Sequence, residues 1–309
     1  LLSAVGAFAQ GQVVGWGRDS GGQTTPRSVS LVPFRDIAGG AGHTLLLRAD
    51  ASVLAIGLND AKQCSVPAGL GGVSAVAAGV GHSLALQASG RIVGWGSNHY
   101  GDARGTEAGG APVLGTADGS PVRINGVTVT DAIQIAAGGT FIDDPNGEGD
   151  IRGTSFAIRT DGSVLAWGCG LVGQLNAPAG LGATRVAAGG DHAIAVRAGD
   201  GAVLAWGLND AGQCGGTDAA GAPIVGGNGG VQVRSLGQPL AGVREVAAGV
   251  RHSLALRADG TVVAWGSDTD QENGTAAGQA TPPVGLSGVT AIAASGSHSM
   301  ALLGNGQVI

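Results

Sequence analysis

Apolar residues alternate with small or polar residues along most of the chain, in short runs. The stretch 252–266, HSLALRADGTVVAWG, contains two such runs separated by Ala-Asp-Gly. Alternation at a period of two is typical of β-strands, and Asp-Gly, Ser-Gly and Asn-Gly pairs between the runs are typical of hairpin turns. The helical period is absent almost everywhere. The pattern therefore predicts an all-β chain.

One phrase recurs along the sequence. It consists of a small-residue run, two variable residues, a His, an apolar strand, a turn, and a second strand that ends in Trp-Gly. Copies occupy 38–57, 77–96, 187–207 and 247–266, a stretched copy fills 136–168, and an incomplete copy ends the chain. Self-similarity at a fixed period is the signature of a repeat architecture.

The spacing of the copies predicts a β-propeller. The steps from position 16 to 56, from 56 to 95 and from 167 to 206 each match the length of one propeller blade, about 40 residues. Each copy divides into four short strands, so we expect four-stranded antiparallel blades. Counting the copies gives six blades. Seven is the alternative, because Gln307–Ile309 begin an extra strand and the chain could be a piece of a larger ring.

The two ends of the chain are complementary in this scheme. The chain opens with QVVGWG and GQTTP, which match the third and fourth strands, and it closes with VTAIAAS and HSMALL, which match the first and second. Pairing of the N- and C-terminal strands would complete the last blade and remove two open sheet edges. We therefore expect the ring to be closed by these strands.

Residues 10–309 are expected to form a single propeller domain with insertions. Two steps between copies are longer than the rest, and the excess lies in Gly-rich links at 97–131 and 208–242 and in FIDDPNGEGDIRG at 141–153. Insertions confined to links leave the strands of the blades intact, so these segments are predicted to be surface loops.

Residues 1–9 differ from the repeats. They are apolar and end in Ala7-Phe8-Ala9, the small-x-small pattern of a signal-peptidase site. This interpretation, a signal-peptide remnant, predicts a secreted, cell-surface or periplasmic protein. The competing interpretation is a degenerate inner strand, in which case the protein is expected in the cytoplasm.

Composition and charge narrow the range of partners. Glycine is abundant, at 61 residues, while 43% of the chain is hydrophobic, which favours many tight turns between strands over disorder. The net charge is −6 and Lys62 is the single lysine. The basic stripe expected of a nucleic-acid-binding protein is missing, and no apolar run is long enough to span a membrane. We expect a monomer that binds neither nucleic acid nor membrane.

The recurring histidines and tryptophans are interpreted as structural. Equivalent positions on neighbouring sheets are too far apart for several imidazoles to share one metal ion. Thr154 replaces His in the stretched copy, and Ile56 replaces Trp in another, which indicates packing rather than a ligand site. The repeated positions are His43, His82, His192, His252 and His298, with Trp16, Trp95, Trp167, Trp206 and Trp265.

An acidic run in the stretched copy is a weak candidate for a calcium site. Asp144, Asn146, Glu148 and Asp150 place oxygen ligands at alternate positions, as in the first half of a calcium loop. The Glu that closes such a loop is replaced by Ser155. A solvated loop is the alternative, and neither a metal nor another cofactor is part of the predicted function.

The repeats resemble the regulator of chromosome condensation repeat family, whose blades carry the phrase A-G-x-x-H-S-L-A-L … V-x-A-W-G-x-N-x-x-G-Q. The short units and the split ends look most similar to the secreted bacterial branch, which includes beta-lactamase inhibitory propellers. The resemblance implies a propeller used as a platform for binding proteins. It also implies two more specific alternatives, namely guanine-nucleotide exchange on a small GTPase and inhibition of a beta-lactamase.

The sequence therefore predicts a non-enzymatic, exported scaffold that binds a protein partner. No nucleophile–base pair supports an enzyme. Antiparallel strand order places the loop before each repeated His and the loop after each Trp-Gly on one face of the propeller, and elaborated loops are where propellers bind. The candidate partner-binding residues on this face are Asn98, His99, Tyr100, Asp143, Asp144 and Glu148.

Overall fold

The computed structural model describes residues 22, 33–114, 117–142, 150–227, 229–269 and 274–309. Strands are the only regular secondary structure in these ranges, which confirms the all-β prediction. Nothing in the same ranges forms an apolar helix of membrane-spanning length. The predicted signal-peptide remnant and the strand around Trp16 lie outside the described residues.

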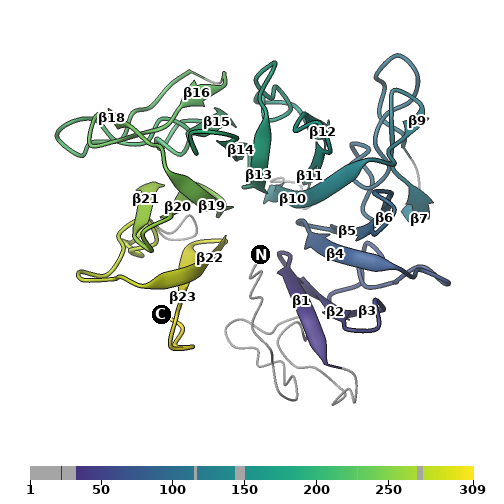
Figure 1. Cartoon of the computed structure of the whole chain (residues 1–309). Coiled ribbons are helices and arrows are strands. Elements are labelled where there is room, and N and C mark those ends of the chain that lie inside the picture. The colour runs from purple at the N-terminus through teal and green to yellow at the C-terminus, as the bar shows by residue number, and fades with distance from the viewer. Residues whose placement is uncertain (1–21, 23–32, 115–116, 143–149, 228, 270–273) are drawn as a thin grey trace. The chain divides into compact units, whose positions relative to one another are not determined.

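The chain divides into two compact units. Unit 1 comprises residues 1–157 and 167–169, and unit 2 comprises residues 158–166 and 170–309. In Figure 1 the strands of unit 1 run from purple to teal and those of unit 2 from teal-green to yellow. Each unit is built from antiparallel sheets that follow one another in chain order.

Unit 1 begins with a three-stranded and a four-stranded sheet, and a third sheet follows at the boundary with unit 2. The strands of the first two sheets are β1 (Phe34–Gly39), β2 (His43–Arg48) and β3 (Val53–Gly57), then β4 (Val73–Ala78), β5 (His82–Gln87), β6 (Ile92–Gly96) and β7 (Ala117–Pro121). The third consists of β10 (Ala132–Ile142), β11 (Asp150–Arg159) and β12 (Val164–Gly168).

Unit 2 continues the same pattern with a four-stranded, a three-stranded and a two-stranded sheet. Its strands are β13 (Ala183–Ala188), β14 (His192–Arg197), β15 (Val203–Gly207) and β16 (Val231–Gln232), then β19 (Val243–Ala248), β20 (His252–Arg257) and β21 (Val262–Gly266), then β22 (Val289–Ser295) and β23 (His298–Leu303).

The predicted hairpins have a common register. The repeated His lies opposite the glycine of Trp-Gly, as in the pairs His82–Gly96 and His252–Gly266. The glycines that follow the tryptophans have φ values between +98° and +104°, a region that side chains with a Cβ rarely adopt. Trp-Gly therefore ends the third strand and turns the chain into the next loop.

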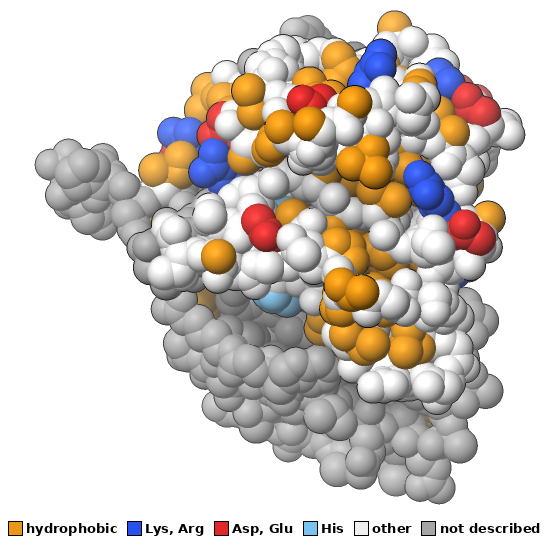
Figure 2. Space-filling model, turned by 90° about the vertical axis from the view of Figure 1, so that its left-hand side faces the viewer, with side chains coloured by type: hydrophobic (Ala, Val, Ile, Leu, Met, Phe, Trp, Pro, Cys, Tyr) orange, Lys and Arg blue, Asp and Glu red, His pale blue; other side chains and the backbone are white. Residues whose placement is uncertain are grey.

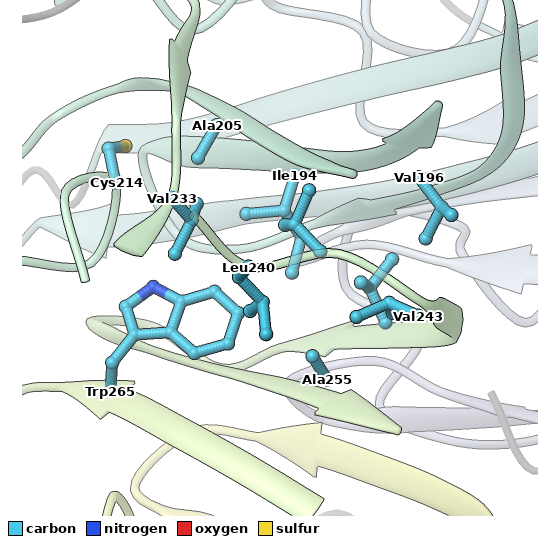
Figure 3. Close-up of a cluster of buried hydrophobic side chains, with 11 residues drawn as sticks. Ile194, Val196, Ala205, Cys214, Val233, Leu240, Val243, Ala255 and Trp265 are labelled. Atoms are coloured by element: carbon cyan, nitrogen blue, oxygen red, sulfur yellow. The ribbon is translucent and has the colours of Figure 1, made fainter. Parts of the chain in front are cut away.

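Apolar side chains from adjacent sheets form the cores. In unit 2, Ile194 and Val196 of β14 pack with Val243 of β19 and Trp265 of β21 (Figure 3). The equivalent cluster of unit 1 packs Leu45 and Leu47 of β2 with Trp95 of β6. The second strands β5, β14 and β20 are buried along nearly their whole length, and each lies between two other strands of its sheet.

The links at 97–131 and 208–242 are folded, so the expectation of plain surface loops is wrong for them. Besides β7 and β16, each contains a short hairpin: β8 (Arg123–Ile124) with β9 (Val127–Thr128), and β17 (Arg234–Ser235) with β18 (Gln238–Pro239). Their bridges join equivalent positions, because Gly105 pairs with Arg123 as Gly216 pairs with Arg234. The two links are copies of one small module.

The insertion at 141–153 is in part an extension of strands. β10 has 11 residues and β11 has 10, against 6 for the matching strands β4 and β5. Residues 141–142 and 150–153 thus belong to the strands, and residues 143–149 between them lie outside the described residues. The extended ends lie on the side of the sheet that carries the loops preceding the repeated histidines.

The last three residues pair with β23. Ala301 donates its backbone N–H to Ile309, and Leu303 donates to Gln307. An antiparallel bridge joins Leu302 and Val308. Gln307–Ile309 therefore occupy, in this structure, the edge of β23 that the predicted N-terminal strand would need.

Candidate functional site

The buried repeated histidines link consecutive sheets. In each case the imidazole Nε2 is within hydrogen-bond distance of a serine hydroxyl from the following copy of the repeat. The distances are 3.0 Å for His43–Ser83, 2.8 Å for His82–Ser155, 2.8 Å for His192–Ser253 and 3.0 Å for His252–Ser299. These contacts join side chains of consecutive copies of the repeat.

A single backbone carbonyl completes each link. Gln213 O accepts the hydroxyl of Ser253 at 3.2 Å and the indole N–H of Trp265 at 2.9 Å. The equivalent serine and tryptophan of other copies donate to Gln63 O and to Asp102 O. Because the serine proton is committed to the carbonyl, the His Nε2 must carry the proton that reaches the serine oxygen.

Glycine in the sequence Ala-Ala-Gly allows this arrangement. A Cβ on Gly249 would overlap the imidazole ring of His252, and a Cβ on Gly79 or Gly189 would overlap His82 or His192. The ring therefore packs directly on the glycine backbone. This explains why a small residue precedes the repeated His by three positions in every copy that has one.

Two departures from the repeat are consistent with a pairing between the repeated histidine and the serine of the next copy. Thr154 stands at the histidine position of the stretched copy, and Ala193 stands at the serine position of the copy after it. The imidazole and the hydroxyl are thus replaced together. His298, in β23, is exposed, unlike the other four repeated histidines.

Burial keeps the linking histidines uncharged. Desolvation lowers the pKa of His43 and His252 from 6.5 to about 4 and that of His192 to about 3. A depressed folded-state pKa contributes stability that is present above pH 6.5 and is lost as the pH falls through the folded pKa. These three residues therefore favour unfolding in acid.

One link has the composition of a catalytic triad. Ser155, His82 and Asp102 follow one another, but all three are fully buried. The Ser155 hydroxyl donates to Asp102 O at 2.7 Å, so neither its proton nor its oxygen is free to react. Because three other copies contain the same His–Ser pair, its geometry is that of a structural link rather than of a nucleophile.

Asn98, predicted to contact a partner, is 4% exposed and acts inside the protein. Its Oδ1 accepts the backbone N–H groups of Ala103 and Arg104, both at 3.1 Å, and its Nδ2 donates to Val113 O. Asn209 makes matching bonds in the other link module. The asparagine after Trp-Gly therefore shapes the loop.

Tyr100 and Asp150, which the sequence assigned to two different sites, lie together. The Tyr100 hydroxyl is 3.0 Å from Asp150 Oδ2, and Arg152 Nε donates to the same oxygen at 2.7 Å. The loop after β6 is thereby joined to the extended hairpin of β10 and β11. His99, next to Tyr100, is exposed.

The calcium candidate cannot be assembled from the described residues. Asp144, Asn146 and Glu148 lie outside them, as does Asp143 of the predicted partner-binding residues, and Asp150 is paired with Tyr100 and Arg152. No group of three or more His, Cys, Asp or Glu side chains suited to a metal occurs where the structure describes the chain.

A shallow, open pocket of about 600 Å³ lies between two adjacent loops of unit 1. Lys62 and Asp60 come from the loop after β3, and His99 comes from the loop after β6. Leu114, which is 58% exposed, supplies an apolar wall. The pocket combines both signs of charge with an apolar contact.

Phe141 and Ile142 are functional candidates that the sequence analysis missed. They end β10 and are 54% and 38% exposed. An exposed aromatic residue is unusual in a chain that is 3% aromatic, and aromatic residues are enriched at the centres of protein interfaces. The signal was present as an apolar pair directly before the acidic run.

Charged side chains do not gather into a basic patch on the face that Figure 2 shows. Lys and Arg side chains there are dispersed among acidic, hydrophobic and uncharged ones, over the part of that face that is described. This agrees with the low charged fraction of 12%.

Comparison with known proteins identifies the repeats. The sequence model of the regulator of chromosome condensation (RCC1) repeat matches residues 73–102, 183–213 and 243–272, and a second model of the same repeat matches 200–256. None of the curated protein sequences shows a significant match to the chain.

Solved structures of similar fold cover most of the chain. Human WBSCR16 is 24% identical with a TM-score of 0.65, over 90% of this chain and 76% of that one. Prp20p from Saccharomyces cerevisiae, described with its binding to Gsp1p and histones, is 22% identical with a TM-score of 0.62, over 88% and 70%. The ectodomain of the Physcomitrella patens receptor kinase CR4 is 18% identical with a TM-score of 0.59, over 92% and 61%. At these identities the likeness concerns the fold.

Proposed function

We propose that this chain, in which several segments match the RCC1 repeat, is a non-enzymatic β-propeller scaffold that binds a protein partner through the loop face of unit 1. One observation carries the proposal. The residues that recur are used inside the fold, whereas the copy that departs most from the repeat exposes Phe141 and Ile142 at the end of β10, in the hairpin whose second strand contacts Tyr100 through Asp150.

The chemistry of this face suits a protein surface. Phe141, Ile142 and Leu114 provide exposed apolar contacts, and the pocket that Leu114 lines offers Asp60, Lys62 and His99. Interfaces combine an apolar centre with a polar rim. The Tyr100–Asp150–Arg152 contact fixes the hairpin against its neighbouring loop, which lowers the entropy lost on binding.

Six blades remain part of the proposal. Six copies of the first and second strands, from β1 and β2 to β22 and β23, support that number. Closure by residues around Trp16 would require them to replace Gln307–Ile309 at the edge of β23. A monomer and export are likewise proposed, and export rests on the motif at Ala7–Ala9 alone.

Exchange on a small GTPase and inhibition of a beta-lactamase are the more specific alternatives. The first is favoured by the fold likeness to Prp20p, and the second by the sequence resemblance described above. Identifying the partner distinguishes the two alternatives.

Site-specific photocrosslinking of the full chain in extracts of its source cells tests the proposal. A photoreactive residue at His99 or Phe141 should capture one and the same protein. A photoreactive residue placed at Ser89 should not capture this protein, because Ser89 lies in the tight turn between β5 and β6 at the opposite end of the strands.

Binding of the captured and purified protein then provides the quantitative test. Phe141→Ser should weaken binding by about 30-fold, as expected for an interface hot spot of about 2 kcal/mol. Val127→Ser is the matched control, because Val127 is 70% exposed in the same unit and lies in the short β8–β9 hairpin. Equal capture from Ser89, or equal affinities of the two variants, would contradict the proposal.

A further inference from the structure

Two buried polar atoms face each other without a hydrogen-bond partner. His82 Nδ1 and Asp102 Oδ2 are 3.5 Å apart, and both side chains are 0% exposed. Neither atom has a hydrogen-bond partner among the described residues. Leaving two such groups unsatisfied is costly, because water cannot reach them.

The remaining atoms of both side chains are already committed. His82 Nε2 donates to Ser155 Oγ at 2.8 Å, because the Ser155 proton goes to Asp102 O. Asp102 Oδ1 accepts the backbone N–H of Tyr100 at 3.2 Å. In the neutral imidazole, Nδ1 is then an acceptor. An acceptor lone pair thus faces a carboxyl oxygen, and only a proton between them makes the contact favourable.

The other links have glutamine in place of Asp102 and therefore no carboxyl at this position, although Nδ1 of His43, His192 and His252 also has no hydrogen-bond partner. Gln63 Oε1 accepts the N–H of Ala61 at 2.9 Å, and Gln213 Oε1 accepts that of Ala211 at 2.8 Å. Asp102 Oδ1 takes over this role toward Tyr100 and leaves Oδ2 pointing at the imidazole. Gly153 covers the pair, since a Cβ there would lie 2.5 Å from Asp102 Oδ2 and 2.8 Å from His82 Nδ1.

We propose that Asp102 binds a proton in mildly acidic solution and donates it to His82 Nδ1, so that this one link gains a hydrogen bond under conditions that destabilise the others. The link is then a proton-binding site built into unit 1 by a single departure from the repeat.

The electrostatic surroundings support this assignment. Burial raises the pKa of Asp102 from 3.8 to about 6 and lowers that of His82 from 6.5 to about 3. The nearby titratable groups are His43 on β2, which burial keeps uncharged, and His99 in the exposed loop. Asp150 and Arg152 on β11 form an ion pair with each other. The Ser97 side chain and the charge of His99 both lower the pKa of Asp102, but burial outweighs them.

The proton balance of the pair follows from these values. Between about pH 4 and pH 6 the unfolded chain carries one proton on the pair, on His82, because its ordinary pKa is 6.5. The folded chain also carries one, on Asp102. Unfolding then takes up no proton at this link, whereas it takes up one proton at each of His43, His192 and His252.

Removing the Asp102 carboxyl should make this link take up a proton on unfolding, as the other links do. In Asp102→Gln, which restores the residue of the other links, and in Asp102→Asn, unfolding should take up one additional proton in this pH range. The unfolding equilibrium constant should therefore rise by a further factor of about ten for each unit of acidification, relative to the unchanged chain. Urea unfolding of the full chain at several values between pH 4 and pH 6 measures this slope.

The reverse change is a matched control. Gln63→Asp places a carboxyl in the link of His43, in which the Ser83 hydroxyl donates to Gln63 O. The Gln63→Asp variant should take up one proton fewer on unfolding than the unchanged chain. The nitrogen-15 resonance of His82 Nδ1 provides an independent readout. It should shift toward the hydrogen-bonded value between pH 7 and pH 5 in the unchanged chain, and show no such shift in Asp102→Gln.

The outcomes separate the proposal from a purely structural role. A loss of stability without a change in pH slope in both Asp102 variants would show that Asp102 only packs. An Nδ1 resonance that stays constant between pH 7 and pH 5 in the unchanged chain would likewise overturn the proposal. Asp102→Asn keeps a donor toward Nδ1, so it is the variant to use if Asp102→Gln does not fold.

Discussion

Trp206→Ala is expected to lower the free energy of unfolding by about 3–5 kcal/mol, the range measured for truncation of large buried aromatic residues. Trp206 is fully buried, and its indole N–H donates to Gln174 O at 2.8 Å. Ala193 occupies the position from which a serine hydroxyl would reach the same carbonyl. The substitution therefore creates a cavity and also removes a hydrogen bond that no serine replaces.

The comparison with Trp265 makes this prediction sharper. Gln213 O accepts both Trp265 and Ser253, so Trp265→Ala leaves that carbonyl with one donor. Trp206→Ala should consequently be the more destabilising change, by about 1 kcal/mol, the usual worth of a buried hydrogen bond. Denaturant unfolding of both variants measures the difference. A loss below about 1 kcal/mol in Trp206→Ala would show that the tryptophan is not part of the packed core.

Gly249→Ala is expected to lower the free energy of unfolding by about 3 kcal/mol. The added methyl group would lie 2.5 Å from His252 Nδ1, so the ring must move. Overpacking of this kind costs about 1–3 kcal/mol, and displacement of the ring also breaks its 3.0 Å contact with Ser299, worth about 1 kcal/mol.

Gly182→Ala is the matched control for Gly249→Ala. No atom lies within 4 Å of the Cβ that it would add, and Gly182 has no left-handed backbone conformation. Its effect should lie within about 0.5 kcal/mol of zero. Thermal or urea unfolding of the two variants under one condition is sufficient. Similar effects at both glycines would mean that the imidazole does not rest on the Gly249 backbone.

The repeat and its hairpins could be predicted because they depend on local sequence. Alternation, turn pairs and the recurring Trp-Gly are readable within about twenty residues. The hydrogen bonds of the links could not be predicted in the same way. His82 and Ser155 are 73 residues apart, and only the packing of consecutive sheets shows that the two recurring positions meet.

The sequences of the two links contain a shared pattern that indicates a folded module. Their Gly-rich composition favoured loops, yet Thr106 and Thr217, at equivalent positions of the two links, each cap the short hairpin of their module with the hydroxyl. Aligning the two links with each other, rather than with the shorter repeats, would have revealed a common folded pattern.

The partner-binding role of the candidate residues stays a prediction. His99 is exposed, and the Tyr100 hydroxyl contacts Asp150 of the extended hairpin. Asn98 was assigned to the same surface because it is polar, but backbone groups of its own loop use its side chain. Polar residues in turns serve the backbone as often as a partner, and sequence alone does not separate these roles.

Asp102 illustrates how a departure from the repeat becomes informative only in three dimensions. In the sequence it is one acidic residue where the other copies have glutamine. In the structure it is a buried carboxyl that faces a buried imidazole. A carboxyl in place of an amide gives this buried site a group that can bind a proton, and burial raises the pKa of that group. The same replacement on the surface would leave the carboxyl with a nearly ordinary pKa.

A double-mutant cycle on His192 and Ser253 tests the central claim, namely that the recurring residues act together to join consecutive sheets. The cycle combines His192→Thr with Ser253→Ala, the pair of residues that Thr154 and Ala193 represent in the natural sequence. The account predicts that the double variant is less destabilised than the sum of the single variants by about 1 kcal/mol. Additivity within about 0.3 kcal/mol would contradict it.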